Sequence, residues 1–460
     1  MTNDSGDWMF LKEKKFANFL SGEIKKDGKE YQALKQKGFI KPNNKTITEL
    51  AGRYLNLNNS LTQGPTLFIF VITLRCNHRC LYCQVTPESP DKKGFDMDEP
   101  TAKRAVDLAF ETPSPYLRIE FQGGEPVLNW PILKFIVKYA KEVNRGKNKD
   151  LKISLVSNLT LIDKDKAKFL LDEGVQLSCS FDGPAKVHDR NRIYLKGKSS
   201  YQAVIQKIKE LQKEKEKKSR QNKEERPDHF NAILTVTKYS LPFYKEIVDE
   251  YMKRGFERIA LRPLSPFGIE KKTVGLIGYS PDEFIDFYKK SMEYILEINK
   301  KGKKITEINS RYILTKILSN SDPNYYEMKS PCGAAFGQMA FNYDGDIYSC
   351  DEGRMASRMG YENFKLGELK KDKLSDVIDH EMVKTICLSS CLENHAGCEN
   401  CAYKPYCGTC TVANFLEYGT IFPQITNTDK CKINKAMFDY IFLKIKDKKN
   451  RAIFEDWLKN

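Results

Sequence analysis

Apolar residues run almost without a break from 66 to 74, TLFIFVITL, and suit a strand buried on both faces. Shorter apolar runs recur along the chain, separated by stretches whose apolar residues have helical spacing. The pattern predicts further strands at 116–122, 151–158, 175–183, 230–237 and 258–264, and helices at 98–111 (capped by Asp98), 131–143, 163–174, 201–218 and 241–255.

Alternating strands and helices predict an α/β fold, with a parallel sheet wrapped by helices as in a complete or partial TIM-like barrel. Loops after the carboxyl ends of such strands carry the chemistry. We predict five units: a small N-terminal module, a barrel core, a helical connector, a loop-rich and cysteine-rich domain, and a C-terminal helix. Their ranges are 1–64, 65–270, 271–330, 331–435 and 436–460. The first unit is either a helical cap or a winged-helix-like module that holds a peptide.

Composition agrees with a globular protein, because 40% of the 460 residues are hydrophobic and 11% are aromatic. The apolar run at 66–74 is too short to span a membrane. The first residues lack the basic, apolar and small-residue pattern of a secretory signal, which predicts a cytoplasmic location.

The formal net charge is +15, but the lysines are scattered along amphipathic helices. The run at 213–228 alternates in sign, which is typical of a solvated helix end and loop. The formal charge counts cysteines as neutral, so metal-bound thiolates would make the true net charge lower than +15. The charge pattern therefore does not favour a nucleic-acid partner.

Thirteen cysteines in a chain without an export signal indicate metal binding rather than disulfides. Cys76, Cys80 and Cys83 lie in RCNHRCLYC, directly after the first predicted strand. Three thiolates can hold a four-iron cluster and leave one iron free for another ligand. The spacing differs from the paired knuckles of zinc ribbons. A zinc-binding interaction protein without catalytic activity is the alternative from another class.

CNHRCLYC after a strand resembles the signature of radical S-adenosylmethionine (radical SAM) enzymes. The resemblance implies a partial (β/α)6 barrel and a [4Fe-4S] cluster that binds S-adenosylmethionine. Cleavage of the cofactor then gives a 5′-deoxyadenosyl radical that removes hydrogen from a substrate. The segments FQGGEP, SNLT, SFDG and HDRNR resemble the cofactor-binding loops of this family. The contacts implied are Gly123, Gly124, Glu125, Pro126, Ser157, Asn158, Ser180 and Arg192, with Asp182 as a further polar side chain.

The C-terminal cysteines resemble the SPASM extension of peptide-modifying radical SAM enzymes, which holds two auxiliary [4Fe-4S] clusters. The resemblance assigns one cluster to Cys398, Cys401, Cys407 and Cys431, and the other to Cys332, Cys350 and Cys410. The second set lacks a fourth cysteine, so its cluster either has an open iron, which we favour, or takes Cys387 or Cys391. We interpret Cys179 as a buried free thiol. We expect His78 and His188 to orient loops rather than bind metal.

Several segments resemble the maturases of His-Xaa-Ser peptide-modification systems, among them LRPLSPFG, FNYDGDIYSCDEGRM and GCENCAYKPYCGTC. This implies a ribosomal precursor peptide as substrate and a cross-link or similar oxidation as product. A flavodoxin or ferredoxin would supply electrons, and a second maturase is a further implied partner. The alternative is an anaerobic sulfatase-maturating enzyme that makes formylglycine. Ser265 stands where we align the aspartate base of that family, which counts against this alternative. No catalytic base is assigned.

Overall fold

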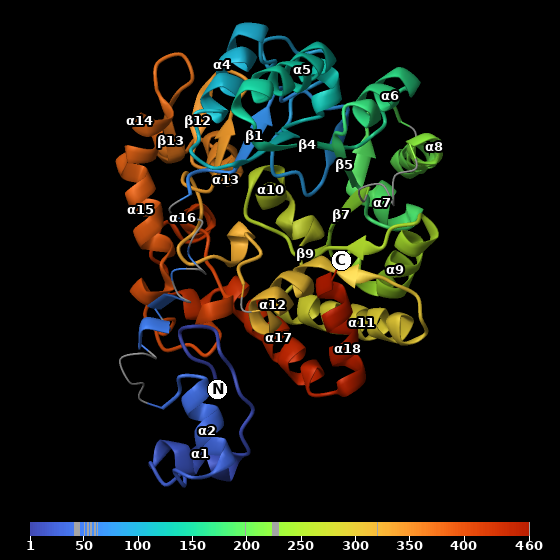
Figure 1. Cartoon of the computed structure of the whole chain (residues 1–460). Helices are drawn as coiled ribbons and strands as arrows, with labels where there is room; N and C mark the ends of the chain where they lie inside the picture. Colours follow the sequence, from blue (N-terminus) through green and yellow to red (C-terminus); the bar gives the residue numbers. More distant parts are fainter. Residues whose placement is uncertain are drawn as a thin grey trace.

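The computed structural model describes residues 1–40, 47–49, 51–52, 55, 58, 61, 63–197, 199–222, 230–319 and 321–459. The described residues contain one large sheet, flanked by helices (Figure 1). Its strand order is β13 (Lys365–Glu368), β12 (Asp346–Tyr348), β11 (Gln338–Phe341), β1 (Leu67–Val71), β3 (Tyr116–Gln122), β4 (Asp150–Ser157), β5 (Gln176–Ser180), β7 (Asn231–Thr235) and β9 (Leu261–Arg262).

Strand β1 is buried on both faces, as its continuous apolar run predicts. Phe68 and Phe70 belong to the main core cluster, together with residues of the helices that cover the outer face. Ile69 and Val71 point to the other face and pack with Ala340 and Tyr348. Residues of the C-terminal strands pack on both faces, since the Phe341 ring also contacts Phe68 and Phe70.

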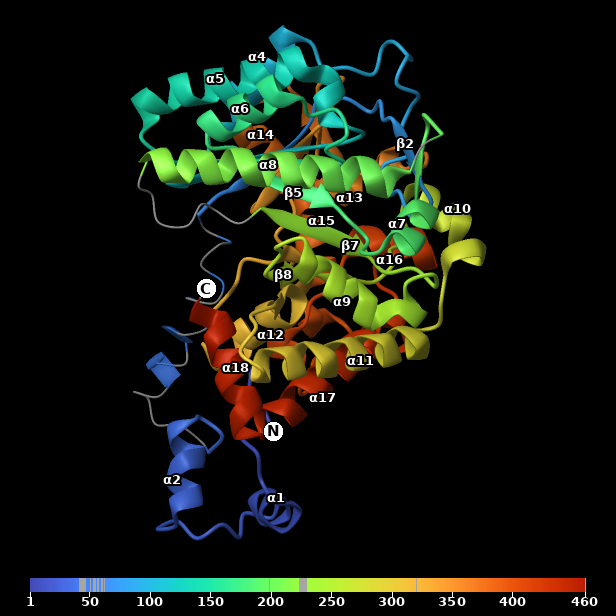
Figure 2. The same ribbon diagram turned by 90° about the vertical axis from the view of Figure 1, so that its right-hand side faces the viewer.

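Six strands, from β1 through β9, run parallel and follow one another in the sheet, which confirms the predicted α/β core. Figure 2 shows helices α5, α6 and α8 in a layer over this sheet. Asp98 accepts a hydrogen bond from Thr101 N at 2.9 Å and caps the first of the outer helices, as predicted. These helices are α4 (Glu99–Ala109), α5 (Trp130–Lys147), α6 (Lys164–Asp172), α7 (Ala185–Asn191), α8 (Ser200–Asn222) and α9 (Tyr244–Lys253).

The last predicted strand, at 258–264, is two short pieces, because β8 (Arg258–Ile259) pairs with β10 (Thr306–Glu307) while β9 joins the large sheet. Helix α10 (Gly268–Ile277) follows and was not predicted. The helices of the predicted connector are α11 (Pro281–Lys300) and α12 (Ile308–Leu318).

The cysteine-rich region has more regular structure than its sequence predicts. Strand β11 pairs with β1 in parallel, and β12 and β13 extend the same sheet by antiparallel pairing. The helices beyond are α13 (Asp351–Ser357), α14 (Leu374–Asp379), α15 (Glu381–Ser390), α16 (Thr411–Tyr418), α17 (Asp429–Ile445) and α18 (Lys448–Lys459). The predicted C-terminal helix is therefore a pair, α17 and α18.

The N-terminal residues form an arm and two short helices, α1 (Glu13–Leu20) and α2 (Lys29–Gln36), which project from the body (Figure 1). The Trp8 indole donates to Ile317 O at 2.8 Å, and the Tyr406 hydroxyl donates to Gly6 O at 2.9 Å. Residues 1–40 contain no strand longer than an isolated bridge, so this described part shows no wing. Most of the expected module between 41 and 62 lies outside the described residues.

Among the described helices, none combines the length and the apolar character that crossing a bilayer requires.

Candidate active site

The loop after β1 carries Cys76, Cys80 and Cys83, and a short ribbon holds it in place. Strand β2 (His78–Cys80) pairs with β6 (Arg192–Tyr194), so that Cys80 lies opposite Arg192. Burial raises the pKa of the Cys80 thiol to about 12, and the pKa values of Cys76 and Cys83 are also raised, mainly by burial. Each thiol lies close enough to another of the three for their charges to interact, so the structure brings the predicted set together.

Glu125 lies in the loop after β3 and is almost completely buried. Its carboxylate accepts hydrogen bonds from Ser157 Oγ and from Asn158 N, both at 2.8 Å, and from Val127 N at 3.2 Å. Burial nevertheless raises the pKa of Glu125. A carboxylate has about four lone-pair sites, so one remains for a further donor. The negative charge of Glu125 also raises the pKa of Cys76, which places this carboxylate beside the cysteine loop.

The glycine pair before Glu125 packs closely against the backbone that leads into the cysteine loop. A Cβ on Gly124 would lie 2.2 Å from Arg75 O, and one on Gly123, at φ +121°, would lie 2.5 Å from Thr73 O. The missing side chains therefore allow this close approach, and a cofactor contact of the two glycines stays a prediction. Pro126 follows and starts the short 3-10 helix Pro126–Asn129.

Arg192 is buried in a hydrogen-bonded network on the other side of the cysteine loop. Its Nη1 donates to the Tyr82 hydroxyl at 2.6 Å, and that hydroxyl lies 2.9 Å from both carboxylate oxygens of Asp182. Burial raises the pKa of Asp182 to about 6. Arg192 Nε has no partner among the described residues, which leaves a buried donor for an anionic group. Ser180 ends β5, two residues before Asp182.

Both histidines of this region are structural, as expected. Nε2 of His78 and Nε2 of His188 lie 2.9 and 3.0 Å from the same Ser200 hydroxyl. Burial lowers the pKa of His78 to about 3 and lowers that of His188 strongly. The His78 ring also stacks on Tyr194, with ring centres 4.7 Å apart.

Cys332, Cys350 and Cys410 form a second group. Cys332 and Cys350 pack in one buried cluster with Cys410 against it. Cys350 precedes α13 and Cys410 precedes α16, and each sulfur accepts a backbone N–H of its helix at 3.4 Å, from Gly353 and Ala413. Helix N-termini favour thiolates, whereas burial raises the pKa of Cys410 to about 12. A bound metal would be needed to deprotonate these thiols.

Cys398, Cys401, Cys407 and Cys431 form a third group. Cys398 and its apolar neighbours pack against Cys407 and Cys431. Burial, followed by the charges of the other three thiols, raises the pKa of Cys398 to about 12. Asn434 Nδ2 donates to the Cys407 sulfur at 3.6 Å, and Tyr403 N donates to the Cys401 sulfur at 3.5 Å.

Cys387 and Cys391 lie next to each other at the end of α15, and whether either completes the second cluster stays a prediction. Their segment does touch the Cys332 loop, since Cys332 N donates to Ser390 Oγ at 2.8 Å. Cys179 is buried in the main core, as expected for a free thiol.

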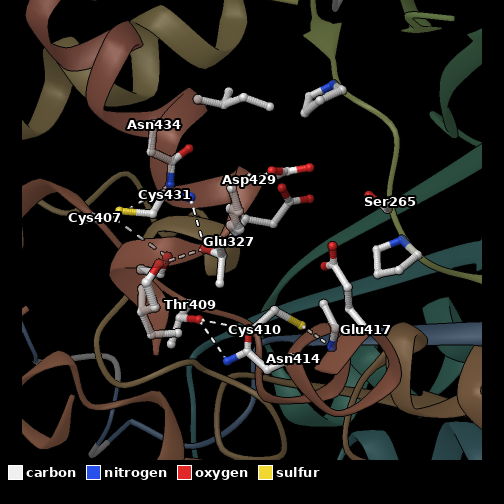
Figure 3. A pocket seen from close by; sticks show the side chains of 18 of the residues that line it. Ser265, Glu327, Cys407, Thr409, Cys410, Asn414, Glu417, Asp429, Cys431 and Asn434 are labelled. Atoms are coloured by element: carbon white, nitrogen blue, oxygen red, sulfur yellow. Dashed lines mark hydrogen bonds between the residues drawn. The ribbon is translucent and has the colours of Figure 1, made fainter. Parts of the chain in front are cut away.

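A cavity of about 420 Å³ extends from Gln84, next to the first cysteine group, to the second and third groups. Figure 3 shows Cys410 and Glu417 on one side, Cys407 and Cys431 on another, and Ser265 opposite. Bound clusters would take part of this volume, because their cysteines line it. Charged side chains of both signs line the cavity: Arg262, Glu270, Lys271, Glu327, Glu352, Lys404, Glu417, Asp429, Lys430 and Lys435.

Residues 70–220 match the family described as the radical SAM superfamily. The chain carries a radical SAM domain. It is accordingly a radical SAM enzyme, which uses S-adenosylmethionine on a [4Fe-4S] cluster. The two auxiliary clusters stay a prediction. Which cysteines hold each cluster stays a prediction.

The chain is similar to a cysteine-type anaerobic sulfatase-maturating enzyme of Clostridium novyi, with 24% identity over 72% of this chain and 83% of the relative. Its fold resembles that of anSMEcpe with bound AdoMet, at a TM-score of 0.69 and 19% identity, over 84% of this chain and 100% of that one. It also resembles Streptococcus suis SuiB bound to the precursor peptide SuiA, at a TM-score of 0.54 and 14% identity, over 88% and 86% of the two chains.

The side chains fit these cofactors. Buried thiols that accept backbone N–H groups suit cluster ligands. The remaining lone pair of Glu125 suits an ammonium group, and the free Nε of Arg192 suits a carboxylate. Among the described residues, no three His, Cys, Asp or Glu side chains converge as ligands of one metal ion. A cluster binds each thiolate through a different iron, so its cysteines do not have to meet at one point.

Sequence reasoning missed Tyr82 and Glu270. Tyr82 lies within the cysteine signature, next to Cys83, and an aromatic residue there gives no signal of a hydrogen bond to a distant carboxylate. Glu270 lies on α10, is 2% exposed, and accepts a hydrogen bond from Ser265 N. Burial raises the pKa of Glu270 to about 8. A glutamate in an exposed-looking stretch, GIEKK, gives no signal of burial.

Glu125→Gln should weaken S-adenosylmethionine binding about tenfold or more, because a charge-assisted hydrogen bond is lost. Equilibrium dialysis of the reconstituted protein would measure the affinity, and iron analysis would show intact clusters. Glu120→Gln is the matched control, since Glu120 lies earlier on β3 and accepts a bond from Ser154 Oγ at 3.0 Å. If Glu125→Gln binds S-adenosylmethionine as tightly as Glu120→Gln, the assignment of Glu125 as a cofactor contact is wrong.

Cys332→Ala should lower the iron content by about four atoms per chain, the content of one cluster. Cofactor cleavage without substrate should persist, because the first cysteine group is intact. Cys387→Ala is the control and should leave iron unchanged. If Cys387→Ala or Cys391→Ala also removes iron, these cysteines complete the second cluster.

Proposed function

We propose that this radical SAM enzyme acts on a ribosomally made peptide and installs a cross-link or a similar oxidation at a carbon atom. The observation that carries the proposal is the cavity that runs from Gln84, the residue after Cys83, to cysteines of both auxiliary groups. A peptide side chain that enters it would lie between Gln84 and Glu352, within reach of both kinds of cluster site.

The chain's own residues would bind and orient the cofactor. Cys76, Cys80 and Cys83 would hold the cluster, and the free iron with its S-adenosylmethionine would supply a radical that takes hydrogen from the substrate. Glu125 would accept from the cofactor's ammonium group, with Ser157 and Asn158 holding the carboxylate in place. Arg192 would donate through Nε to its carboxylate.

Cys332, Cys350 and Cys410 would hold a cluster able to take up the electron that the substrate gives up. Cys410, Glu352 and Lys430 line the cavity from the side of the second group. Cys398, Cys401, Cys407 and Cys431 would hold the third cluster, which could pass the electron on to an oxidised external electron carrier. A flavodoxin or ferredoxin as electron donor, a second maturase as partner and a cytoplasmic location remain parts of this proposal.

A sulfatase-maturating activity is the second candidate, and a specific observation favours it. Ser265 would be a poor base, but the Glu270 carboxyl lies against it and lines the same cavity. The serine therefore no longer counts against formylglycine formation. Similarity to a sulfatase-maturating enzyme and to a peptide-bound SuiB supports the two candidates equally.

Incubation with two synthetic peptides would separate them: one with His-Xaa-Ser repeats and one with the target cysteine of a sulfatase. We expect the first peptide to lose two hydrogens by mass spectrometry and not to react with an aldehyde-specific hydrazide. Cys76→Ala should abolish the change. Exchange of sulfur for oxygen together with loss of two hydrogens in the second peptide, with a positive hydrazide reaction, would establish formylglycine formation instead.

A further inference from the structure

Arg354 is the largest fully buried charged side chain of the described residues, with 0% exposure. Its Nε donates to Asp351 Oδ1 at 2.7 Å. Nη1 and Nη2 have no partner among the described residues. Buried donors without acceptors are rare in proteins, and a charged group is the most costly case. The two free donors therefore point to an acceptor that is not a protein atom.

Helix α13 places Arg354 against the loop of the first cysteine group. Arg358, one turn further along, donates to Glu88 Oε1 at 2.7 Å, and Gly268 N donates to Met359 Sδ at 3.2 Å. Val85 packs against the apolar cluster that contains Met355. Residues four apart share a helix face, so Arg354 faces the same segment, 83–88, as Arg358. Figure 1 shows α13 beside β12, close to α10.

Cys83, a predicted cluster ligand, lies in the segment that Arg354 faces. Burial raises the pKa of its thiol, and the positive charges of Arg192 and Arg354 act in the opposite direction. The two arginines differ in their bonds. Arg192 already donates to Tyr82 and faces the expected cofactor position, whereas Arg354 comes from the cysteine-rich region and keeps both Nη groups free.

We propose that Arg354 donates through Nη1 and Nη2 to sulfur atoms of the radical SAM cluster on its Cys83 side and raises its reduction potential. The inference rests on one part of the proposed function, namely that Cys76, Cys80 and Cys83 hold the radical SAM cluster. A cluster held by three thiolates gains negative charge on reduction, so a nearby cation and hydrogen bonds to sulfur favour the reduced form. The C-terminal region thus tunes the cluster of the barrel.

The test is a redox titration of the full-length reconstituted protein, followed by electron paramagnetic resonance. The radical SAM cluster is identified as the signal that changes when S-adenosylmethionine is added. In Arg354→Met, the ratio of reduced to oxidised cluster at the wild-type midpoint should fall about tenfold, a 59 mV shift for one electron. Arg354→Lys keeps the positive charge but loses the planar guanidinium with its two Nη donors. Its ratio of reduced to oxidised cluster should lie between those of Arg354→Met and the wild type.

Two further variants make the outcome decisive. Arg354→Met combined with Asp351→Asn avoids a buried unpaired carboxylate if the single variant does not fold, and should show the same shift. Arg358→Met is the matched control on the same helix and should leave the ratio within about twofold, because Glu88 already neutralises Arg358.

An unchanged ratio with intact iron would overturn the proposal. So would a weakened cofactor affinity without a change in ratio, which would assign Arg354 to S-adenosylmethionine, or a shift confined to an auxiliary cluster. A wild-type protein that has the cofactor-responsive signal but leaves both peptides unmodified would count against the proposed substrate alone. The absence of any cofactor-responsive cluster would overturn both proposals.

Discussion

The parallel hydrogen bonds on both edges of β1 set the positions of all the other elements around the site. On one edge, Leu67–Val71 pairs with β3, whose far end carries the Glu125 loop. On the other edge it pairs with β11, between Cys332 and Cys350. Because both pairings share one short strand, the cysteine loop, the cofactor loops and the second cysteine group cannot move independently. The outer helices cover one face of β1, and the C-terminal strands contribute to the other.

The sequence was sufficient to predict the alternation of strands and helices, because buried parallel strands have continuous apolar runs in their sequence. It also predicted which cysteines the fold brings near one another, although which of them hold a cluster stays a prediction. It did not reveal β11–β13, which are only three or four residues long and lie among cysteines and glycines. Nor did it reveal the burial of Glu270 and Arg354, because a charged residue in a polar stretch gives no local signal that tertiary packing encloses it.

The glycine pair illustrates a different limit. The resemblance implied cofactor contacts at Gly123 and Gly124, and the structure adds that a Cβ at either position would meet the backbone at Thr73 or Arg75. Composition can indicate that a Cβ has no room, whereas only the fold identifies which atom excludes it. The spacing of Cys387 and Cys391 likewise left a ligand role open, and the structure places these two side chains next to each other.

The Ser200 hydroxyl shared by two histidines has a consequence for proton arrangement. Asp182 N donates to His188 Nδ1 at 3.2 Å, so His188 carries its proton on Nε2 and donates to Ser200. The single hydroxyl hydrogen must then go to His78 Nε2, which leaves the His78 proton on Nδ1, directed at Asn77 Oδ1 at 3.2 Å. The hydrogen bonds of this network therefore all donate in the same direction, from the SFDG loop towards the cysteine loop. Neither imidazole can gain a proton without breaking one of these hydrogen bonds. The hydrogen-bonded network next to the first cysteine group should therefore keep the same donor direction across the physiological pH range.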